Sequence, residues 1–158
     1  MENSSLARPP SILPVKDPPK EKPRKIVHPN LPELPTIMCL VMPTKSGKST
    51  ILSNLLLRED FYKGVFDNVT IMSNTIDQDV TSRFLRKACD CYTGYDDNVL
   101  AGIIEQQKSF DDEERPFVGM IFDDILGSVK RSSYLNHLVT RSRHYGVGLL
   151  AISVQSFK

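Results

Sequence analysis

The chain has 158 residues, of which 40% are apolar and 25% are charged, which is typical of one globular domain. No apolar run approaches the roughly 18 residues that span a bilayer, and the first residues lack the apolar core of a secretory signal. The net charge of +1 excludes a globally basic nucleic-acid binder, so any contact with nucleic acid is expected to be local. We therefore expect a protein without a membrane segment that stays in a cytosol-like compartment.

Residues 1–35 form a proline-rich tail. Nine of the eleven prolines lie here, and because each removes a backbone donor and fixes φ, neither a regular helix nor a central strand is expected. A group of lysines and an arginine makes the middle of the tail basic: Lys16, Lys20, Lys22, Arg24 and Lys25. We predict a disordered or polyproline-like segment, which is either a solvated linker or a tether for acidic partners or nucleic-acid phosphates.

Residues 36–158 alternate short apolar runs with segments of helical spacing. Strands are predicted at 36–42, 68–73, 117–122 and 147–154, and helices at 48–58, 77–91, 98–110 and 132–144. The apolar runs are continuous, which is typical of parallel strands buried on both faces, so Cys39 in the first run is interpreted as a small buried residue. The alternation predicts an α/β fold with a mostly parallel sheet covered by helices on both faces.

Polar groups follow three of these predicted strands. Ligands of parallel α/β sheets bind beyond the carboxyl ends of the strands. The loop at 43–47, the acidic pair Asp123-Asp124 and Gln155 all fall at such ends. We therefore expect them to meet at one edge of the sheet.

The loop after the first strand has the pattern of a phosphate-binding loop, also called Walker A. Its candidate nucleotide-binding residues are Pro43, Thr44, Lys45, Ser46, Gly47, Lys48, Ser49 and Thr50. In this pattern Lys48 reaches the β- and γ-phosphates of ATP and Ser49 binds Mg²⁺. Met42 stands where the pattern has its first glycine. The alternative is a strand-to-helix turn without a ligand.

The other candidates are catalytic or metal-binding side chains. Asp123 would bind Mg²⁺ through water as the Walker B acid, and Asp124 would polarise the attacking water or merely cap the following turn. Gln155 would sense the γ-phosphate or orient water. Arg141 and Arg143 either compensate a helix dipole or serve as an arginine finger for the nucleotide of a neighbouring subunit.

Three segments together resemble a known family. Met42 to Thr50, Ile121-Phe122-Asp123-Asp124 and Arg141-Ser142-Arg143-His144-Tyr145-Gly146, with a strand that ends in Gln155, look like the genome-packaging ATPases of large double-stranded DNA viruses. These enzymes belong to the FtsK/HerA group. The resemblance covers residues 36–158.

The resemblance implies a P-loop NTPase sandwich of the additional-strand type, in which the Gln155 strand lies between the strand before the loop and the Asp123 strand. It implies ATP and Mg²⁺ as ligands, a homo-oligomeric ring, double-stranded DNA and possibly a capsid protein as partners, and a location in a viral factory of the host cytoplasm or in the virion. The resemblance also implies a role for each residue. Lys48 and Ser49 would bind phosphate and Mg²⁺, Asp123 would bind Mg²⁺, and Asp124 would activate the attacking water. Gln155 would sense the γ-phosphate, and Arg141 or Arg143 would act as an arginine finger in trans.

Two features depart from that family. Met42 and Lys45 replace its usual glycines, and the chain ends soon after Gln155, where the family continues with at least one strand. We therefore expect a partial ATPase core over 36–158. Three hypotheses follow: a DNA-translocating ATPase, a P-loop kinase or other phosphotransferase, and a non-catalytic module that binds nucleotide or a capsid partner.

Overall fold

A computed structural model describes residues 28–43, 45–125, 127–129, 131 and 133–155. Its centre is one sheet of five parallel strands in the order β1-β5-β4-β2-β3. The strands are β1 Thr36–Met42, β2 Asn68–Ser73, β3 Asp90–Thr93, β4 Val118–Asp123 and β5 Val147–Gln155. The predicted α/β class is confirmed, and β5 lies between β1 and β4 as expected.

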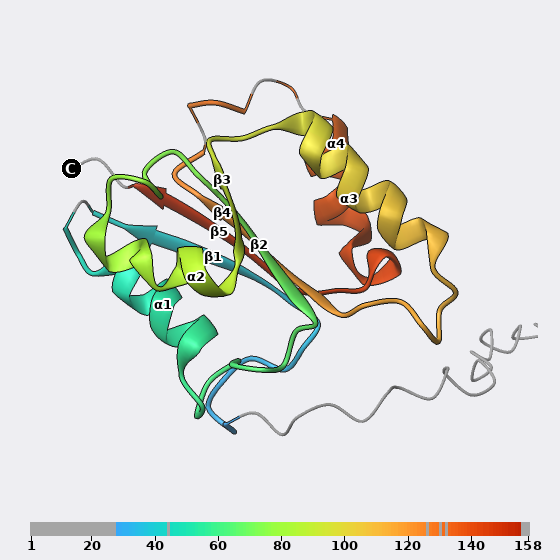
Figure 1. Ribbon diagram of the computed structural model, residues 1–158, viewed down its shortest axis with the longest axis horizontal. Helices are drawn as coiled ribbons and strands as arrows, with labels where there is room; N and C mark the ends of the chain where they lie inside the picture. The colour runs from blue at the N-terminus through green and yellow to red at the C-terminus, as the bar shows by residue number, and fades with distance from the viewer. Residues whose placement is uncertain (1–27, 44, 126, 130, 132, 156–158) are drawn as a thin grey trace, which may run out of the picture.

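Helices cover both faces of this sheet (Figure 1). One face carries α1 Lys48–Leu57, the 3₁₀ helix η1 Val80–Arg83 and α2 Leu85–Ala88, and the other carries α3 Asp97–Ser109, α4 Ser133–Arg141 and the 3₁₀ helix η2 Ser142–Tyr145. Each face has its own apolar core, with Leu52 of α1 in the first and Leu100 of α3 in the second. Burying one such side chain contributes roughly 1.5–3 kcal/mol to the free energy of folding, so both helical layers stabilise the sheet.

Strand β1 differs from the prediction that it is buried on both faces. Its side chains alternate between partly buried and exposed, and Ile37 and Val41 are 51% and 60% exposed. Cys39 between them is also exposed, which corrects its interpretation as a buried residue. The reason is that β1 is the edge strand among the described residues, and the core under α3 and α4 includes none of its side chains.

Residues 77–91 do not form the single helix that was predicted. The segment divides into η1, α2 and the start of β3, and Asp79 rather than Asp77 caps the first of these. Of the helically spaced apolar residues, Leu85 is buried, whereas Val80 and Phe84 are largely exposed. Strand β3 has four residues, too few to show a strand period in the sequence, and it adds a fifth strand beside β2.

The predicted helix over 132–144 is shorter in the structure and continues as η2. Gly146 ends η2 with a left-handed φ of 69°, and a Cβ at this position would lie 2.6 Å from the Pro116 carbonyl oxygen. Only glycine meets both conditions, because other residues rarely adopt this φ and real Cβ atoms do not come so close to an oxygen. Gly146 therefore fixes the sharp turn into β5.

The described part of the N-terminal segment packs against the domain. Leu31 and Leu34 contact the core under α1, and the Tyr62 hydroxyl donates a hydrogen bond to the Pro32 carbonyl at 2.9 Å. The folded region therefore begins before residue 36, whereas the basic middle of the predicted tail lies outside the described residues. Within the described ranges, none of the helices is both long enough and apolar enough to cross a membrane.

Candidate nucleotide-binding site

The loop between β1 and α1 has the backbone of an anion-binding turn. Gly47 has a φ of 91° and directly precedes α1, so the helix begins with its free N–H groups at the loop. Lys45 is also left-handed, with a φ of 61°, although it carries a side chain. Met42 still belongs to β1 and pairs with Gln155, so its position needs no glycine. Thr44 lies outside the described residues.

Lys48 connects this loop to the end of β4. Its ammonium nitrogen lies 3.3 Å from an oxygen of Asp123 and forms a second ion pair with Asp124. The side chains of these three residues are each less than 15% exposed, so solvent screens the pairs only weakly. The structure thus brings Lys48 to two acids that follow it by 75 and 76 positions in the sequence.

Asp123 is held by the strands on either side of it. Ser73 of β2 donates a hydrogen bond to one carboxylate oxygen at 2.9 Å, and Ser153 of β5 donates one to the other. Parallel pairing places these serines directly beside Asp123 in the strand register. The sequence pattern did not predict either serine, because their contact with Asp123 depends on the adjacency of β2, β4 and β5. Two donors and one cation fix the orientation of the carboxylate.

Asp124 has an unusual backbone conformation, with a φ of 52°. Its N–H donates to the Ser153 carbonyl at 3.2 Å, and its own carbonyl accepts a hydrogen bond from the Asn74 side chain at 2.7 Å. A bond to β5 and a bond from the residue after β2 therefore hold the left-handed conformation, which costs roughly 1–2 kcal/mol for most residues with a Cβ and less for Asp or Asn. Conformations of this kind are concentrated at functional sites.

This conformation turns the Asp124 side chain into the cavity. One carboxylate oxygen pairs with Lys48 and lies 3.4 Å from the Gln155 amide nitrogen, which donates to it. The other oxygen is buried without a hydrogen-bond partner among the described residues. An orphaned carboxylate oxygen in a cavity is a suitable acceptor for a water or a metal-bound water.

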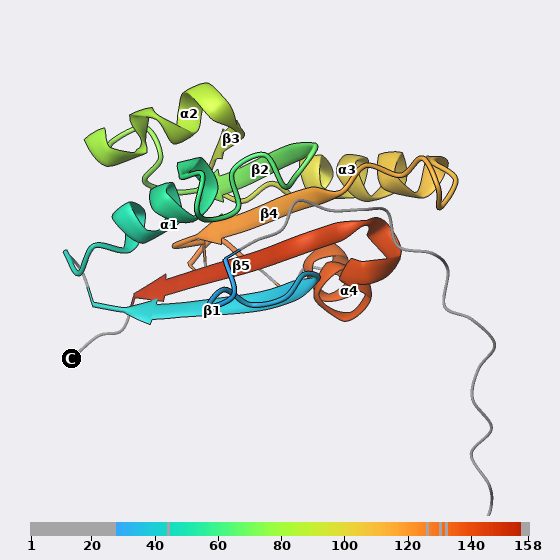
Figure 2. The same ribbon diagram turned by 90° about the horizontal axis from the view of Figure 1, so that it is seen from below.

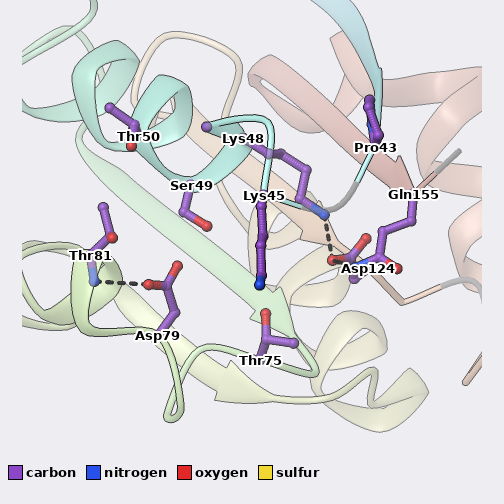
Figure 3. A pocket seen from close by; sticks show the side chains of 11 residues that line it. Pro43, Lys45, Lys48, Ser49, Thr50, Thr75, Asp79, Thr81, Asp124 and Gln155 are labelled. Atoms are coloured by element: carbon purple, nitrogen blue, oxygen red, sulfur yellow. Dashed lines mark hydrogen bonds and ion pairs between the residues drawn. The ribbon is translucent and has the colours of Figure 1, made fainter.

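A cavity of about 340 Å³ joins these groups at the carboxyl edge of the sheet (Figure 3). Of the predicted residues, the following line it: Pro43, Lys45, Gly47, Lys48, Ser49, Thr50, Asp124 and Gln155. Ser46 is exposed and is not part of the lining, and Asp123 lies just behind Asp124 in the sheet. The volume is within the range of small-ligand sites.

The opposite wall of the cavity was not predicted. It consists of Thr75 and Asp79 from the segment between β2 and η1, and of Thr81 from η1 itself. Burial raises the pKa of the Asp79 carboxyl, but hydrogen bonds from Ser49, Thr81 and Ser82 together lower that pKa below its ordinary value. Asp79 is therefore a stable anion that faces the phosphate loop. Asp79 and Thr81 were not predicted as site residues because the sequence pattern predicted one helix over 77–91.

Arg141 and Arg143 are not brought to the cavity. They lie at the end of α4 and in η2, just before the first residue of β5, whereas the cavity lies beyond its last residue. At roughly 3.3 Å per residue, the nine residues of β5 separate them from the site by about 25 Å. Neither arginine reaches this cavity within the same chain.

The donor set of the cavity suits Mg²⁺. This ion is usually bound by one or two carboxylates together with phosphate oxygens and waters, rather than by an all-protein cage. The Ser49 hydroxyl and the unpartnered oxygen of Asp124 supply oxygen donors of this kind in the cavity, and the Asp123 carboxylate lies just behind Asp124. Among the described residues, no cluster of three or more His, Cys, Asp or Glu side chains forms an alternative metal site.

Comparisons of the chain with protein-family models, with curated proteins and with solved structures found no significant match.

Proposed function

We propose that this chain binds ATP with Mg²⁺ in the cavity between the phosphate loop and the carboxyl ends of β4 and β5, and that it hydrolyses the γ-phosphate. The observation that carries this proposal is the meeting of Lys48 with Asp123 and Asp124 at that edge. A cation from a helix start and two acids from a strand end are the charges that a phosphate–metal complex needs.

Phosphate binding rests on the loop and on Lys48. The free N–H groups at the start of α1 and the positive end of its dipole favour phosphate oxygens. The Lys48 ammonium has three N–H donors, so it can keep a carboxylate partner while it donates to a phosphate. Lys45 lines the same cavity and adds a second positive charge.

Hydrolysis rests on Asp124 and Gln155. When bound, Mg²⁺ supplies neutralisation of the charge that develops on the phosphate oxygens; Ser49 and Asp123 would hold it. A water oxygen forms the new bond to the γ-phosphorus while the bond to the β–γ bridging oxygen breaks. Asp124 accepts the proton of that water, and the Gln155 amide orients the water.

The first test compares Lys48 variants. Lys48→Ala removes a charge-assisted hydrogen bond worth about 1.5–3 kcal/mol, so ATP affinity should fall about 10- to 100-fold and turnover should be lost. Lys48→Arg keeps a positive charge beside the two carboxylates and controls for folding, and Lys108→Ala on α3 is the matched surface control. Calorimetric titration and phosphate release measure the two effects. Full activity of Lys48→Ala contradicts the proposal.

We further propose that ATP hydrolysis drives the translocation of double-stranded DNA, as the resemblance of the motifs implies. Turnover should then rise when double-stranded DNA is added at low salt, where phosphate contacts are strongest. The same assay with single-stranded DNA is the control. Unchanged turnover over the whole range of DNA concentrations argues against translocation and leaves ATP hydrolysis intact as a proposal.

A second candidate is a nucleotide-binding module with little turnover of its own. It is favoured by the absence of any arginine among the described residues that line the cavity, because an arginine finger contributes about 10³–10⁵ in rate to related reactions. Tight binding of an ATP analogue with no phosphate release at any protein concentration would support this candidate. A specific activity that increases with protein concentration would support the oligomeric ATPase.

A further inference from the structure

The phosphate loop carries a second lysine whose positive charge is not paired in the described part of the chain. Lys48 forms ion pairs with Asp123 and Asp124, whereas the side chain of Lys45 makes no ion pair or hydrogen bond with a described residue. Both lysines line the same cavity. Of the two, Lys45 is the one whose charge no described carboxylate neutralises.

The backbone of Lys45 adopts a conformation that rarely suits a lysine. Its φ of 61° is left-handed, which is unfavourable for most residues with a Cβ and which glycine adopts freely. Figure 3 shows the side chain extending from the loop into the cavity, with its ammonium group toward Thr75. Conformations of this kind are concentrated at functional sites. A lysine at a position that favours glycine therefore indicates a role for the side chain itself.

The end of the cavity that Lys45 faces is the end that holds the acids of β4. The Thr75 N–H donates a hydrogen bond to the Ser73 hydroxyl at 3.2 Å, and the two hydroxyl oxygens lie 3.3 Å apart. Ser73 in turn donates to the Asp123 carboxylate at 2.9 Å. Two hydrogen-bonded steps therefore connect Thr75 to the acid behind Asp124. Both lysines of the loop are thus directed toward the acidic end of the cavity.

A terminal phosphate at this end would meet two cations. We propose that Lys45 is a further catalytic residue, which binds the γ-phosphate together with Lys48 and makes the site selective for nucleoside triphosphates over diphosphates. This inference rests on the proposed function, because that function places the γ-phosphate beside Asp124 and Gln155. The Lys45 ammonium donates a hydrogen bond to a γ-phosphate oxygen, and its charge stabilises the negative charge of the γ-phosphate oxygens during hydrolysis. Lys45 keeps its proton throughout.

This role of Lys45 needs no second subunit. None of the described residues that line the cavity is an arginine, and Arg141 and Arg143 lie about 25 Å away in the same chain. Lys45 belongs to the loop that forms the cavity. Its contribution to nucleotide binding should therefore be independent of protein concentration, unlike that of a residue supplied by a neighbouring copy.

Three variants of Lys45 separate its charge from its backbone. Lys45→Gln removes the charge but keeps a long polar side chain, and Lys45→Arg keeps the charge. Lys45→Gly removes the side chain and suits the φ of 61°, so it should melt at least as high as the parent protein. Lys87→Gln is the matched control, because Lys87 is an exposed lysine of α2 and no residue of that helix lines the cavity.

The test is calorimetric titration of the full chain, in the presence of Mg²⁺, with a non-hydrolysable ATP analogue and with ADP. The parent protein should bind the analogue more tightly than ADP. In Lys45→Gln and Lys45→Gly the loss of a charge-assisted hydrogen bond should weaken analogue binding at least about tenfold and leave ADP binding within about twofold. Lys45→Arg and Lys87→Gln should keep the preference of the parent protein. The rate of phosphate release at saturating ATP should fall in the glutamine and glycine variants and recover in Lys45→Arg.

The outcomes separate the two proposals. A parent protein that binds neither nucleotide contradicts the proposed function, and the role of Lys45 with it. If the parent protein binds both and the ratio of the two dissociation constants is the same in Lys45→Gln and Lys45→Gly, the role of Lys45 is overturned while the site stands. Equal weakening of both nucleotides also overturns it, because Lys45 would then contact a phosphate that both share. An equal shift in Lys87→Gln overturns it as well, since the effect would then reflect general charge.

Discussion

At the scale of single residues, the site depends on side chains held in fixed orientations by neighbouring strands. Asp123 is oriented by Ser73 and Ser153, and the left-handed backbone of Asp124 is held by bonds to Ser153 and Asn74. The sequence pattern predicted the two acids because they end an apolar run. It could not predict the two serines or Asn74, because which residues face an acid depends on strand order and register.

The conformation of Asp124 makes a prediction that separates backbone from charge. Asp124→Asn and Asp124→Ala both remove the charge, but asparagine tolerates a φ of 52° better than alanine does. We expect Asp124→Ala to be less stable than Asp124→Asn by about 1 kcal/mol, measured as the free energy of unfolding in urea. Both should lose turnover and keep nucleotide binding. Equal stability of the two variants would show that the backbone is not constrained at this residue.

At the scale of elements, long apolar runs were predicted well and short or mixed segments were not. Strands β2, β4 and β5 and helices α1 and α3 lie within about two residues of their predicted bounds. The segment 77–91 was wrong because Val80 and Phe84 have helical spacing but face solvent. Apolar periodicity indicates a helix only when the apolar face packs against a core, and in α2 the buried residue is Leu85 alone.

Strand β1 is a second case in which apolar residues that were expected to be buried are exposed. Its apolar run predicted burial on both faces, yet Cys39 is exposed at the edge of the sheet. Burial, with a smaller contribution from the charges of Cys91 and Asp90, raises the pKa of the Cys89 thiol to about 12. A thiol reacts as its thiolate, so Cys39 and Cys89 should differ strongly in their rate of reaction with thiol reagents.

We therefore expect a thiol reagent at pH 8 to modify Cys39 at least about 100-fold faster than Cys89, whose thiolate fraction is very small at that pH. The fast phase should vanish in Cys39→Ser, and the slow phase should speed up as the pH rises toward the raised pKa of Cys89. Mass spectrometry of the labelled peptides measures both rates. Slow labelling of Cys39 would mean that the outer face of β1 is covered in solution.

At the scale of the whole molecule, strand order creates the site. Figure 2 shows β5 between β1 and β4. In this order, Gln155 pairs with Met42 at the start of the loop and Ser153 pairs with Asp123. Strand alternation predicted that the polar strand ends share one edge, and the strand order followed from the resemblance of the motifs. The wall with Asp79 depends on the path between β2 and β3, which no pattern in the sequence specified.

The same topology places Arg141 and Arg143 at the far end of β5, so they can serve a cavity only in another subunit. A head-to-tail contact between copies would bring the start of β5 in one subunit to the cavity of the next. Lys48→Ala keeps both arginines but lacks the lysine that the proposed function assigns to phosphate binding, and the double variant Arg141→Ala/Arg143→Ala has the reverse defect. Each of the two variants, assayed alone, should have little ATP turnover.

Mixing the two variants tests this arrangement. In random 1:1 oligomers, half of the sites keep Lys48 and half of their neighbours keep the arginines, so about a quarter of the parent activity should return if the finger acts between subunits. Phosphate release, measured across protein concentrations that span oligomer formation, gives the recovery. Full activity of the double arginine variant alone, or no recovery on mixing, would remove both arginines from the mechanism and leave the phosphate loop, Asp124 and Gln155 as its catalytic groups.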